Sequence, residues 1–553
     1  MTVLSRLFGL VGKLPRAHTH RIRVDRDIPV PLPSGHTLLA DRYYPDVAGG
    51  DRLPVLLNRN PYGSRAEGLM ARVFAERGYQ AVVAKVRGTF GSEGDWTPFF
   101  NEQADGHATL DWVTSQPWFT GSLGMFGGSY HGLTQWAVAE DAPEFLKAIA
   151  PSVTASNFAE FMYPGGGFGL ESAMTWIYGL EHGDQGILRM LLSQRAQAKV
   201  LPGATLTVPL ADADTALIGH HEANFQAWLD NEDRYGPYWD RVNFGRRLDK
   251  IPPATFMAGW YDLFCSEQVK DFAAVRAAGR PARLTIGPWT HGSAGSAARM
   301  LRETLLWMDA YVAGTTPPPG DRGSVQLFVM GAKRWESFDA WPPPATTQSW
   351  FLQPAGALRD TAPPESEPDR YRYDPNDPTP VAGGTSLYGP HAGPKDQRAV
   401  EARADVLTYT TAPMAGDVTV VGEPRARLHV RSSLDNTDFW VRVCDVAPDG
   451  SSTNLCDGLV RLSANAIDRN ADGSFVVEVP LGPTANTFLA GHAVRVQVAS
   501  GAHPLRARNS GSGEPLGKAT TLVAADQEVL HDPAHPSVVE LPVLDAPIGK
   551  RGR

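Results

Sequence analysis

The strongest constraint on the fold is an alternation of short apolar runs with helical patterns between residues 35 and 155. The runs are continuously apolar, which is typical of strands buried on both faces of a sheet. They are PVLLN (54–58), QAVVAKV (80–86), LGMF (123–126) and LKAIAPSV (146–153). Apolar residues recur at helical spacing between them, so the sequence predicts βαβ units and a mostly parallel sheet with helices on both faces.

This βαβ pattern is interrupted by a long segment of different character. Residues 156–245 contain aromatic-rich helical patterns, such as ESAMTWIYGL, and no convincing strand. Strand patterns return in ATFMAGWYD (254–262) and ARLTIGPW (282–289), and a helical pattern follows them. We therefore predict an α/β catalytic domain of residues 21–155 and 246–315, with residues 156–245 inserted as a helical cap.

The C-terminal region has a third pattern. A Pro- and Gly-rich linker at 315–323 precedes short alternating strands such as SVQLFVMG, RARLHVRS and AVRVQVAS, which are separated by turn clusters such as APDG and NADG. Alternation of this kind is typical of an antiparallel sandwich with one buried face. The sequence predicts a β jelly-roll domain over residues 324–553.

Composition limits the partners and the compartment. The chain has 51 Lys and Arg against 60 Asp and Glu, a net charge of -9, which disfavours nucleic acid and anionic membranes as partners. No run approaches the roughly 18 apolar residues that a transmembrane helix needs. The three cysteines Cys265, Cys444 and Cys456 cannot form a disulfide framework and lack zinc-site spacing. We expect a cytoplasmic protein without a metal site; whether it forms a homodimer is left open.

The sharpest local signal is MFGGSYHG, residues 125–132, where a short apolar strand runs into a helical pattern. A serine on such a tight turn, here Ser129, is exposed at the top of a sheet, and the glycines remove the clashes of the turn. The spacing departs from the usual G-x-S-x-G, because His131 precedes the second glycine, Gly132. A glycine-rich turn with an incidental serine is the alternative interpretation.

A serine nucleophile needs a base and an orienting carboxylate, which α/β-hydrolases supply after later strands in the order acid, then histidine. Asp262 ends the predicted strand ATFMAGWYD, and His291 follows the strand ARLTIGPW. Together with Ser129, these residues all fall just beyond the carboxyl ends of strands, where open α/β sheets bind ligands. We therefore predict a Ser129, Asp262, His291 triad.

Two further residues fit an oxyanion hole. The backbone N–H of Tyr130, the residue after the predicted nucleophile, is one expected donor. Tyr62 follows the strand PVLLN within RNPYG (59–63), so its phenol O–H lies at the same end of the sheet and can serve as the other donor. The alternative for Tyr62 is a half-buried aromatic residue of the loop.

Several motifs together resemble one family. They are RNPYG (59–63), VRGTFGSEG (86–94), GGSYHG (127–132), GWYDLF (259–264), GPWTHG (287–292), QLFVMGAKRWESFDAWPPP (326–344) and RARLHVRSSLDNTDFWVRVCDV (425–446). The chain resembles the CocE/NonD hydrolases, the cocaine-esterase and X-Pro dipeptidyl-peptidase family of α/β-hydrolases. The resemblance implies the triad and oxyanion hole named above, a helical cap over the site and a C-terminal jelly roll. It also implies that Phe264 lines an acyl pocket.

The expected function is hydrolysis of a small-molecule ester or acyl amide through an acyl-enzyme, with no cofactor. An X-Pro dipeptidyl peptidase is an alternative, although those relatives carry additional N-terminal helical structure. A β-lactam acylase or α-amino-acid ester hydrolase is another, because Glu171, Glu181 and Asp184 of the predicted cap could bind a substrate ammonium. A remote alternative is a carbohydrate-binding protein whose hydrolase domain is inactive.

Overall fold

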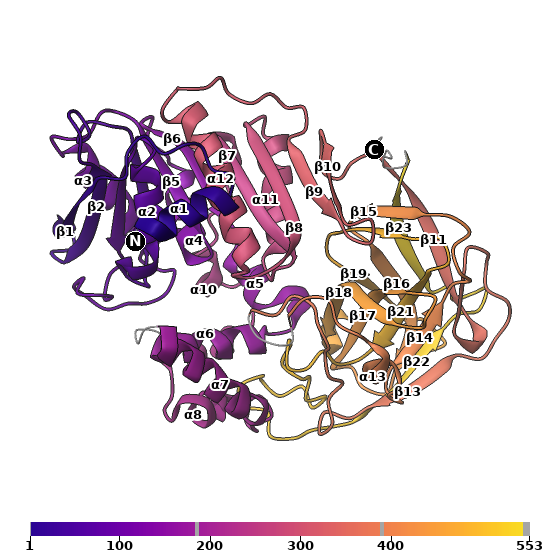
Figure 1. The fold of residues 1–553 in the computed structure, drawn as a ribbon. Coiled ribbons are helices and arrows are strands. Elements are labelled where there is room, and N and C mark those ends of the chain that lie inside the picture. Colours follow the sequence, from indigo (N-terminus) through magenta and orange to yellow (C-terminus); the bar gives the residue numbers. More distant parts are fainter. Residues whose placement is uncertain (1, 183–186, 388–391, 546–553) are drawn as a thin grey trace.

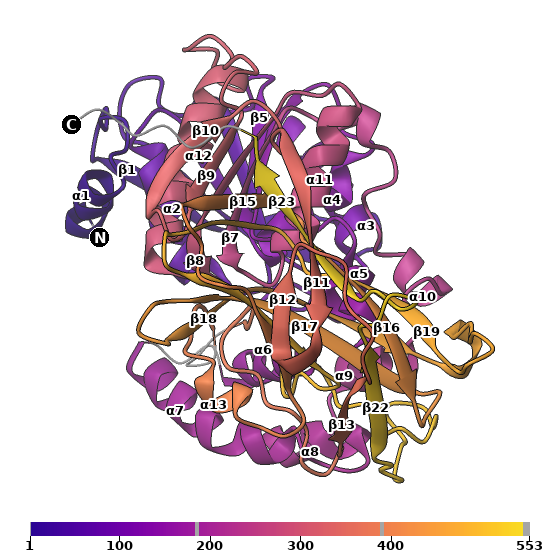
Figure 2. The same cartoon turned by 90° about the vertical axis from the view of Figure 1, so that its right-hand side faces the viewer.

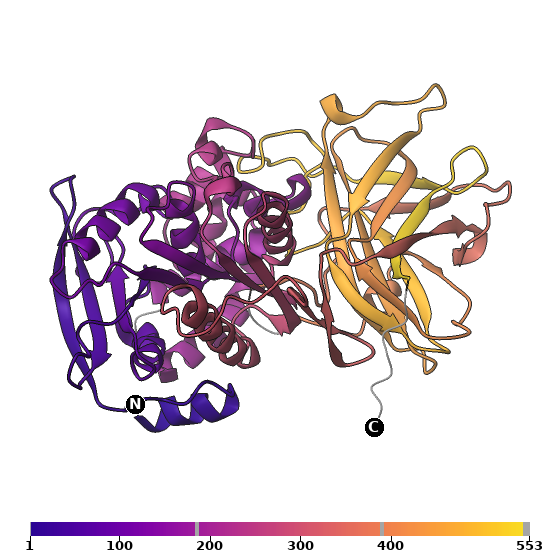
Figure 3. The same cartoon turned by 90° about the horizontal axis from the view of Figure 1, so that it is seen from above.

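The computed structural model describes residues 2–182, 187–387 and 392–545. Figure 1 shows an α/β region with helices on both faces of its sheet, a group of helices beneath it and a β-rich region at its side. Seen from above in Figure 3, the α/β region and the β-rich region lie next to each other. The sequence-based division into three kinds of structure is therefore recognisable in the chain.

The α/β region is built on a ten-stranded sheet of order β1-β2-β4-β3-β5-β6-β7-β8-β9-β10. Neighbours from β4 to β9 run parallel, whereas β1, β2 and β10 pair antiparallel at the two edges. The strands are β1 (Ile22–Pro31), β2 (Thr37–Pro45), β3 (Val55–Asn60), β4 (Gln80–Lys85), β5 (Leu123–Gly128), β6 (Leu146–Ser152), β7 (Ala254–Tyr261), β8 (Ala282–Thr290), β9 (Val325–Val329) and β10 (Arg334–Phe338).

The two faces of this sheet pack into separate cores, because neighbouring residues of a strand point to opposite sides. Val55 and Leu57 of β3 share a core with the helices α3, α4 and α11, while Leu56 belongs to the core that includes α2 and α12. These helices are α2 (Ser64–Ala75), α3 (Glu102–Thr114), α4 (Tyr130–Ala139), α11 (Cys265–Ala277) and α12 (Ala294–Tyr311). Helix α1 (Thr2–Val11) lies outside these layers, next to α2.

Two strands, β9 and β10, belong to a different domain from the one the sequence predicted. The run SVQLFVMG was expected to begin the jelly roll, but β9 pairs in parallel with β8 through Leu284 and Val325, and β10 pairs with β9. Residues 325–338 therefore extend the α/β sheet. The predicted domain boundary was wrong here because β9 lies near the edge of the sheet. Its alternate residues are only partly buried, so its sequence pattern resembles that of a sandwich strand.

The C-terminal region is a 13-stranded β structure, in which all pairs except β12 with β14 are antiparallel. Figure 2 views these strands face-on. They are β11 (Ala345–Gln353), β12 (Ala357–Arg359), β13 (Asp369–Tyr373), β14 (Leu407–Thr410), β15 (Val418–Gly422), β16 (Arg425–Ser432), β17 (Thr437–Val446), β18 (Ser452–Leu462), β19 (Phe475–Pro480), β20 (Thr484–Phe488), β21 (Ala493–Ala499), β22 (Ala525–Leu530) and β23 (Val538–Leu544).

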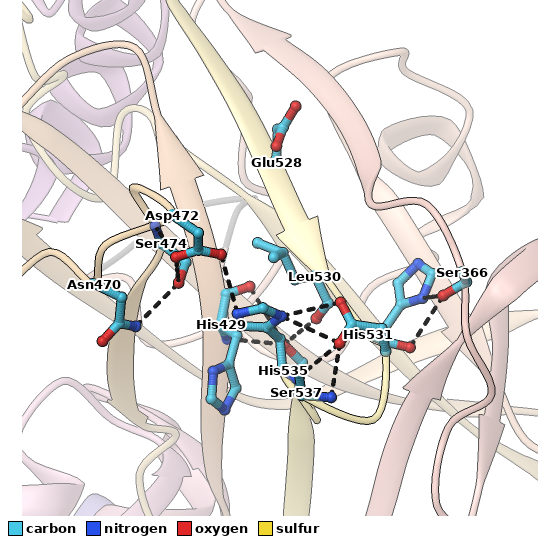
Figure 4. Close-up of polar contacts among 12 residues, drawn as sticks. Ser366, His429, Asn470, Asp472, Ser474, Glu528, Leu530, His531, His535 and Ser537 are labelled. Atoms are coloured by element: carbon cyan, nitrogen blue, oxygen red, sulfur yellow. Dashed lines mark hydrogen bonds and ion pairs between the residues drawn. The ribbon is translucent and has the colours of Figure 1, made fainter.

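Polar contacts fasten the turn between β22 and β23 to its neighbours (Figure 4). The imidazole of His535 lies between two carboxylates, with Nδ1 3.0 Å from Asp532 Oδ2 and Nε2 3.2 Å from Asp472 Oδ2. The hydroxyl of Ser537 donates to the Leu530 carbonyl (2.6 Å) and accepts the N–H of His429 (2.8 Å). These side chains bond polar groups of the turn within the protein, which meets the need of buried polar groups for hydrogen-bond partners.

The predicted cap is helical, and its two ends meet at one place. Its helices are α5 (Phe158–Met162), α6 (Leu170–His182), α7 (Ile187–Ala204), α8 (Ala213–Ile218), α9 (Ala223–Asp230) and α10 (Pro237–Asp240). The Phe244 N–H donates to the Ser156 carbonyl (2.9 Å), and Asn157 bridges to Asn243. Asp271 of α11 accepts the Ser156 N–H (3.0 Å) and hydroxyl (2.6 Å). This carboxyl therefore anchors the cap to the α/β region.

The cap anchor makes stability depend on pH. Burial raises the pKa of Asp271 to about 7, although the hydrogen bonds from Ser156 act in the opposite direction. Because the folded-state pKa lies above the unfolded value, the stabilisation is fully present below about pH 4 and is lost as the pH rises through about 7. We expect Asp271→Asn, which mimics the protonated acid, to raise the Tm relative to the wild type at about pH 8 and to change it little at about pH 4.

Thermal unfolding of both proteins at the two pH values checks this expectation. The exposed Asp249, changed to Asn, is the matched control, because it makes the same substitution away from the cap anchor and should not reproduce the gain in Tm at about pH 8. An Asp271→Asn effect that does not vary with pH would contradict the assignment.

Candidate active site

Ser129 occupies a strained turn between β5 and α4. Its φ is 59°, in a region that non-glycine residues rarely adopt, and its N–H donates to the Ser152 carbonyl at 2.9 Å. Gly127 has a φ of 134°, and a Cβ there would lie 2.4 Å from the Cβ of His131. The chain can make this turn only because glycine precedes the serine.

The departure from the usual motif spacing has a packing cause. A Cβ at Gly132 would lie 2.4 Å from Cγ2 of Thr154, so α4 needs its glycine at this position. His131 is buried instead, with Nε2 3.6 Å from Oε1 of Glu67 and its ring 5.5 Å from the ring of Tyr62. A larger residue at 131 is therefore compatible with the elbow.

The predicted acid and base are in contact. Asp262 follows β7 and His291 follows β8, and His291 Nδ1 lies 2.8 Å from Asp262 Oδ2. Asp262 is fully buried, and its Oδ1 accepts the Phe264 N–H at 2.9 Å. An imidazole that donates its Nδ1 proton to this carboxylate presents the lone pair of Nε2 on its other side. The pair thus has the arrangement that a general base requires.

Four of the predicted site residues line one cavity, and a ring contact connects one of them to the acid–base pair. Ser129, Tyr62, Tyr130 and Phe264 all contribute to its wall. The ring of Phe264 lies 5.8 Å from that of His291, which connects the cavity to the acid–base pair. The other lining residues are mostly apolar and come largely from the cap: Phe99, Phe158, Phe161, Met162, Ser172, Ala173, Trp176, Trp228, Leu263 and Leu387.

Tyr62 lies on the loop after β3 and reaches the cavity from one side. Its backbone N–H donates to Oδ1 of Asn60 (2.8 Å), whose amide donates to Asn58 (2.9 Å). Asn58 in turn donates to the Phe126 carbonyl of β5 (3.0 Å). This chain of amides joins the loop of Tyr62 to the strand that leads into Ser129. The phenol oxygen accepts a hydrogen bond from Nε1 of Trp176 at 3.1 Å.

Tyr130 belongs to a buried network that the sequence interpretation missed. Its phenol donates to Oε1 of Glu102 (2.7 Å) and accepts the Phe99 N–H (3.0 Å). Glu102 pairs with Arg59 of β3 at 3.1 Å, and the two side chains are 3% and 0% exposed. Burial raises the pKa of Glu102 and raises that of Tyr130 well above its usual value, so the phenol stays protonated.

This network was detectable in principle, because an arginine inside an otherwise apolar buried strand demands a partner. The sequence does not say which acid supplies it: Glu102 lies 43 residues away from Arg59, at the start of a helix where acidic residues are common. Gly106 in the same helix makes room for the guanidinium, since a Cβ there would lie 3.0 Å from Arg59 Nη1.

The carboxylates considered for ammonium binding do not line the cavity in the described part of the chain. Glu171 is buried and accepts the Leu387 N–H (3.2 Å) and the Thr175 hydroxyl (3.3 Å). Glu181 is half exposed and lies 3.6 Å from His220. Asp184 lies outside the described residues.

Among the described residues, no group of three or more His, Cys, Asp or Glu side chains is arranged to hold a metal ion. Over residues 2–182, 187–387 and 392–545, no helix combines the length and the apolar character needed to cross a membrane.

Breaking the buried ion pair between Arg59 and Glu102 should lower the free energy of unfolding. Arg59→Met removes the charge that faces Glu102 while it keeps an unbranched side chain. Loss of one partner of a buried pair typically costs about 3–5 kcal/mol, and we expect urea unfolding to show a decrease of this size. Adding Glu102→Gln removes the uncompensated charge and should restore part of the loss. A double variant less stable than Arg59→Met alone would contradict this account of the pair.

Comparison with known proteins identifies the family. The family model described as X-Pro dipeptidyl-peptidase (S15 family) matches residues 34–293, and the X-Pro dipeptidyl-peptidase C-terminal non-catalytic domain matches residues 320–540. Cocaine esterase of Rhodococcus sp. (strain MB1 Bresler) is 32% identical, over 94% of this chain and 98% of that protein.

Solved structures agree in fold. An α-amino acid ester hydrolase superposes with a TM-score of 0.79 at 22% identity, over 96% of this chain and 98% of the other. A CocE/NonD family hydrolase from Staphylococcus aureus superposes with a TM-score of 0.69 at 16% identity, over 97% and 98%. This chain therefore belongs to the CocE/NonD family of serine esterases and peptidases, which confirms the resemblance and the α/β-hydrolase fold with a C-terminal β domain, and it is a hydrolase.

Proposed function

We propose that the protein hydrolyses small-molecule carboxylic esters with an uncharged, apolar acyl group, through a triad of Ser129, His291 and Asp262. The observation that carries the proposal is the 2.8 Å contact between Asp262 and His291 beside an aromatic cavity that includes Ser129. The relatives are enzymes, which favours a hydrolase over a carbohydrate-binding protein.

In the proposed mechanism, the Ser129 hydroxyl attacks the ester carbonyl while Nε2 of His291 accepts its proton. Asp262 holds the imidazole in the tautomer that leaves Nε2 basic and stabilises the imidazolium that forms. His291 then gives the proton to the departing alcohol as the ester C–O bond breaks, which leaves an acyl group on Ser129. Water, deprotonated by His291, attacks this acyl-enzyme, and His291 returns the proton to the Ser129 oxygen as the acyl C–O bond breaks and the acid is released. The scheme requires no cofactor.

Two donors would stabilise the oxyanion of each tetrahedral intermediate. Tyr130 is the first residue of α4, so its backbone N–H has no acceptor within the helix and can bind the oxyanion. The phenol O–H of Tyr62 is the second, because Tyr62 and Tyr130 line the cavity beside Ser129. An oxyanion donor of this kind typically contributes about 10²–10³ in kcat.

The aromatic lining supports the choice of acyl group. Phe264 stacks on Phe161 of the cap at 4.4 Å and faces the ring of His291, so it forms a wall of the acyl pocket. An ammonium placed among such side chains would lose its hydration without gaining a carboxylate. Both α-amino-acid ester hydrolysis and X-Pro dipeptide release require a site for the substrate's free amine, so we favour a plain ester as substrate.

Labelling tests the nucleophile. A fluorophosphonate should modify Ser129 and abolish ester hydrolysis, because the elbow makes this hydroxyl the accessible one. Mass spectrometry of the digested protein locates the label. Ser129→Ala should neither react nor turn over esters, whereas Ser172→Ala, which changes another cavity serine, should still be labelled. Modification of a different residue, or an active Ser129→Ala variant, would overturn the assignment.

Matched substrates test the acyl preference. Methyl phenylacetate and phenylglycine methyl ester share the same ring and leaving group, but only the second carries an ammonium. We expect kcat/KM to be at least about tenfold higher for methyl phenylacetate, since burying an unpaired charge costs more than 1.4 kcal/mol. A preference for phenylglycine methyl ester, or efficient cleavage of an Xaa-Pro anilide, would instead support the amine-binding alternatives.

A further inference from the structure

The cap touches the proposed oxyanion hole through one hydrogen bond. Trp176 lies in α6, and its Nε1 is 3.1 Å from the phenol oxygen of Tyr62, 114 residues away in sequence. An indole N–H can only donate, so the phenol oxygen is the acceptor in this bond. The contact therefore uses a lone pair of the Tyr62 oxygen and not its proton.

The orientation of Trp176 is set by its packing. Its ring stacks on Phe99 at 5.7 Å with an interplanar angle of 11°, and on Trp228 at 5.7 Å with an angle of 22°. Trp96 contacts it edge-on at 5.9 Å. Tyr130 is a fourth neighbour, with its ring 6.4 Å from that of Trp176. These four aromatic neighbours hold the indole, so its N–H points at Tyr62 before any substrate arrives. Donors and dipoles arranged in advance are the ones that lower a barrier, because no reorganisation is needed during the reaction.

We propose that Trp176 is a positioning residue for the oxyanion hole, an inference that rests on the proposed role of Tyr62. The indole N–H occupies one lone pair of the phenol oxygen and thereby restricts rotation about its C–O bond. The O–H proton is then directed away from Trp176, toward the cavity that Ser129 lines. Accepting a hydrogen bond also polarises the phenol and makes it a better donor. The cap in this way contributes to the chemical step.

The two possible roles of Trp176, lining the cavity wall or positioning Tyr62, predict different kinetics for its variants. If Trp176 only lines the cavity, its replacement weakens substrate binding whatever residue stands at position 62. If it orients the Tyr62 phenol, its loss lowers the rate of acylation, and that loss disappears once the phenol hydroxyl is gone. A double-mutant cycle between the two positions separates these cases.

The experiment measures single-turnover acylation by p-nitrophenyl phenylacetate in the wild type, Trp176→Phe, Tyr62→Phe and the double variant. Trp176→Phe keeps an aromatic ring but removes the N–H. We expect it to slow acylation about tenfold, the size expected for one neutral hydrogen bond, with KM nearly constant. In the Tyr62→Phe background the same change should alter the rate less than twofold, as expected for a bond that is already absent.

Trp239→Phe is the matched control. It also removes an indole N–H of the cap, but this group donates to the Asn231 carbonyl at 2.7 Å and not to Tyr62. Its effect should be the same in both backgrounds. A second variant guards against altered packing in Trp176→Phe: incorporating 3-benzothienylalanine at position 176 keeps the bicyclic shape and replaces only the N–H by sulfur. It should reproduce the loss of rate.

The outcomes separate the two proposals. If Tyr62→Phe acylates like the wild type, the role of Tyr62 is wrong and the inference about Trp176 falls with it. If Tyr62→Phe is slow but Trp176→Phe costs the same factor in both backgrounds, the oxyanion donor stands and the positioning role is overturned. An acylation rate equal to that of the wild type in the benzothienylalanine variant would also overturn the positioning role of Trp176.

Discussion

The arrangement of the site depends on a strained backbone at Ser129. A positive φ at a non-glycine residue costs about 1–3 kcal/mol and persists only where the surroundings enforce it. Here the enforcement is visible: Gly127 and Gly132 admit contacts that a Cβ would block, and the Ser129 N–H is held by β6. The turn places Ser129 directly before the first residue of α4, so the proposed nucleophile and the proposed backbone oxyanion donor, the Tyr130 N–H, are set by one local conformation.

The second proposed oxyanion donor, Tyr62, follows a different strand, and buried polar contacts fix the place of its loop relative to Ser129. The amides of Asn58 and Asn60 connect the loop of Tyr62 to β5, while Arg59 and Glu102 connect the same strand to the phenol of Tyr130. Residues alternating along β3 thus reach α4 and its preceding strand from both faces of the sheet. Polar side chains in a buried strand are costly unless all are bonded, which explains why their partners are so closely specified.

Much of this architecture was predictable because it follows from local patterns. Continuous apolar runs identified the central strands. Three of these strands end just before Ser129, Asp262 and His291, which places the three residues at the same end of the parallel strands. The resemblance to known hydrolases added Phe264, which does line the cavity. The predictions failed where the outcome depended on the place of a strand in the sheet or on a partner distant in sequence. Strand β9 lies near an edge of the sheet, where burial alternates, and Glu102 looks like an ordinary acidic residue in the first turn of a helix. In the sequence, Trp176 is one of several aromatic residues of the predicted cap. No local pattern indicates its contact with Tyr62, which lies 114 residues away.

The cap is more than an insulating cover in this arrangement. Its two ends are joined at Ser156 and held by Asp271, so the insertion leaves and re-enters the α/β region at one anchored point. From there α5 supplies Phe161 to the cavity wall, and α6 supplies Trp176, which donates a hydrogen bond to Tyr62. Under the proposed function, a displacement of the cap would therefore alter the fit of the acyl group and the orientation of the Tyr62 phenol together. In this arrangement, binding energy from the substrate's acyl group can hold the phenol of Tyr62 in place. Recognition of the acyl group is then coupled to the rate of the chemical step.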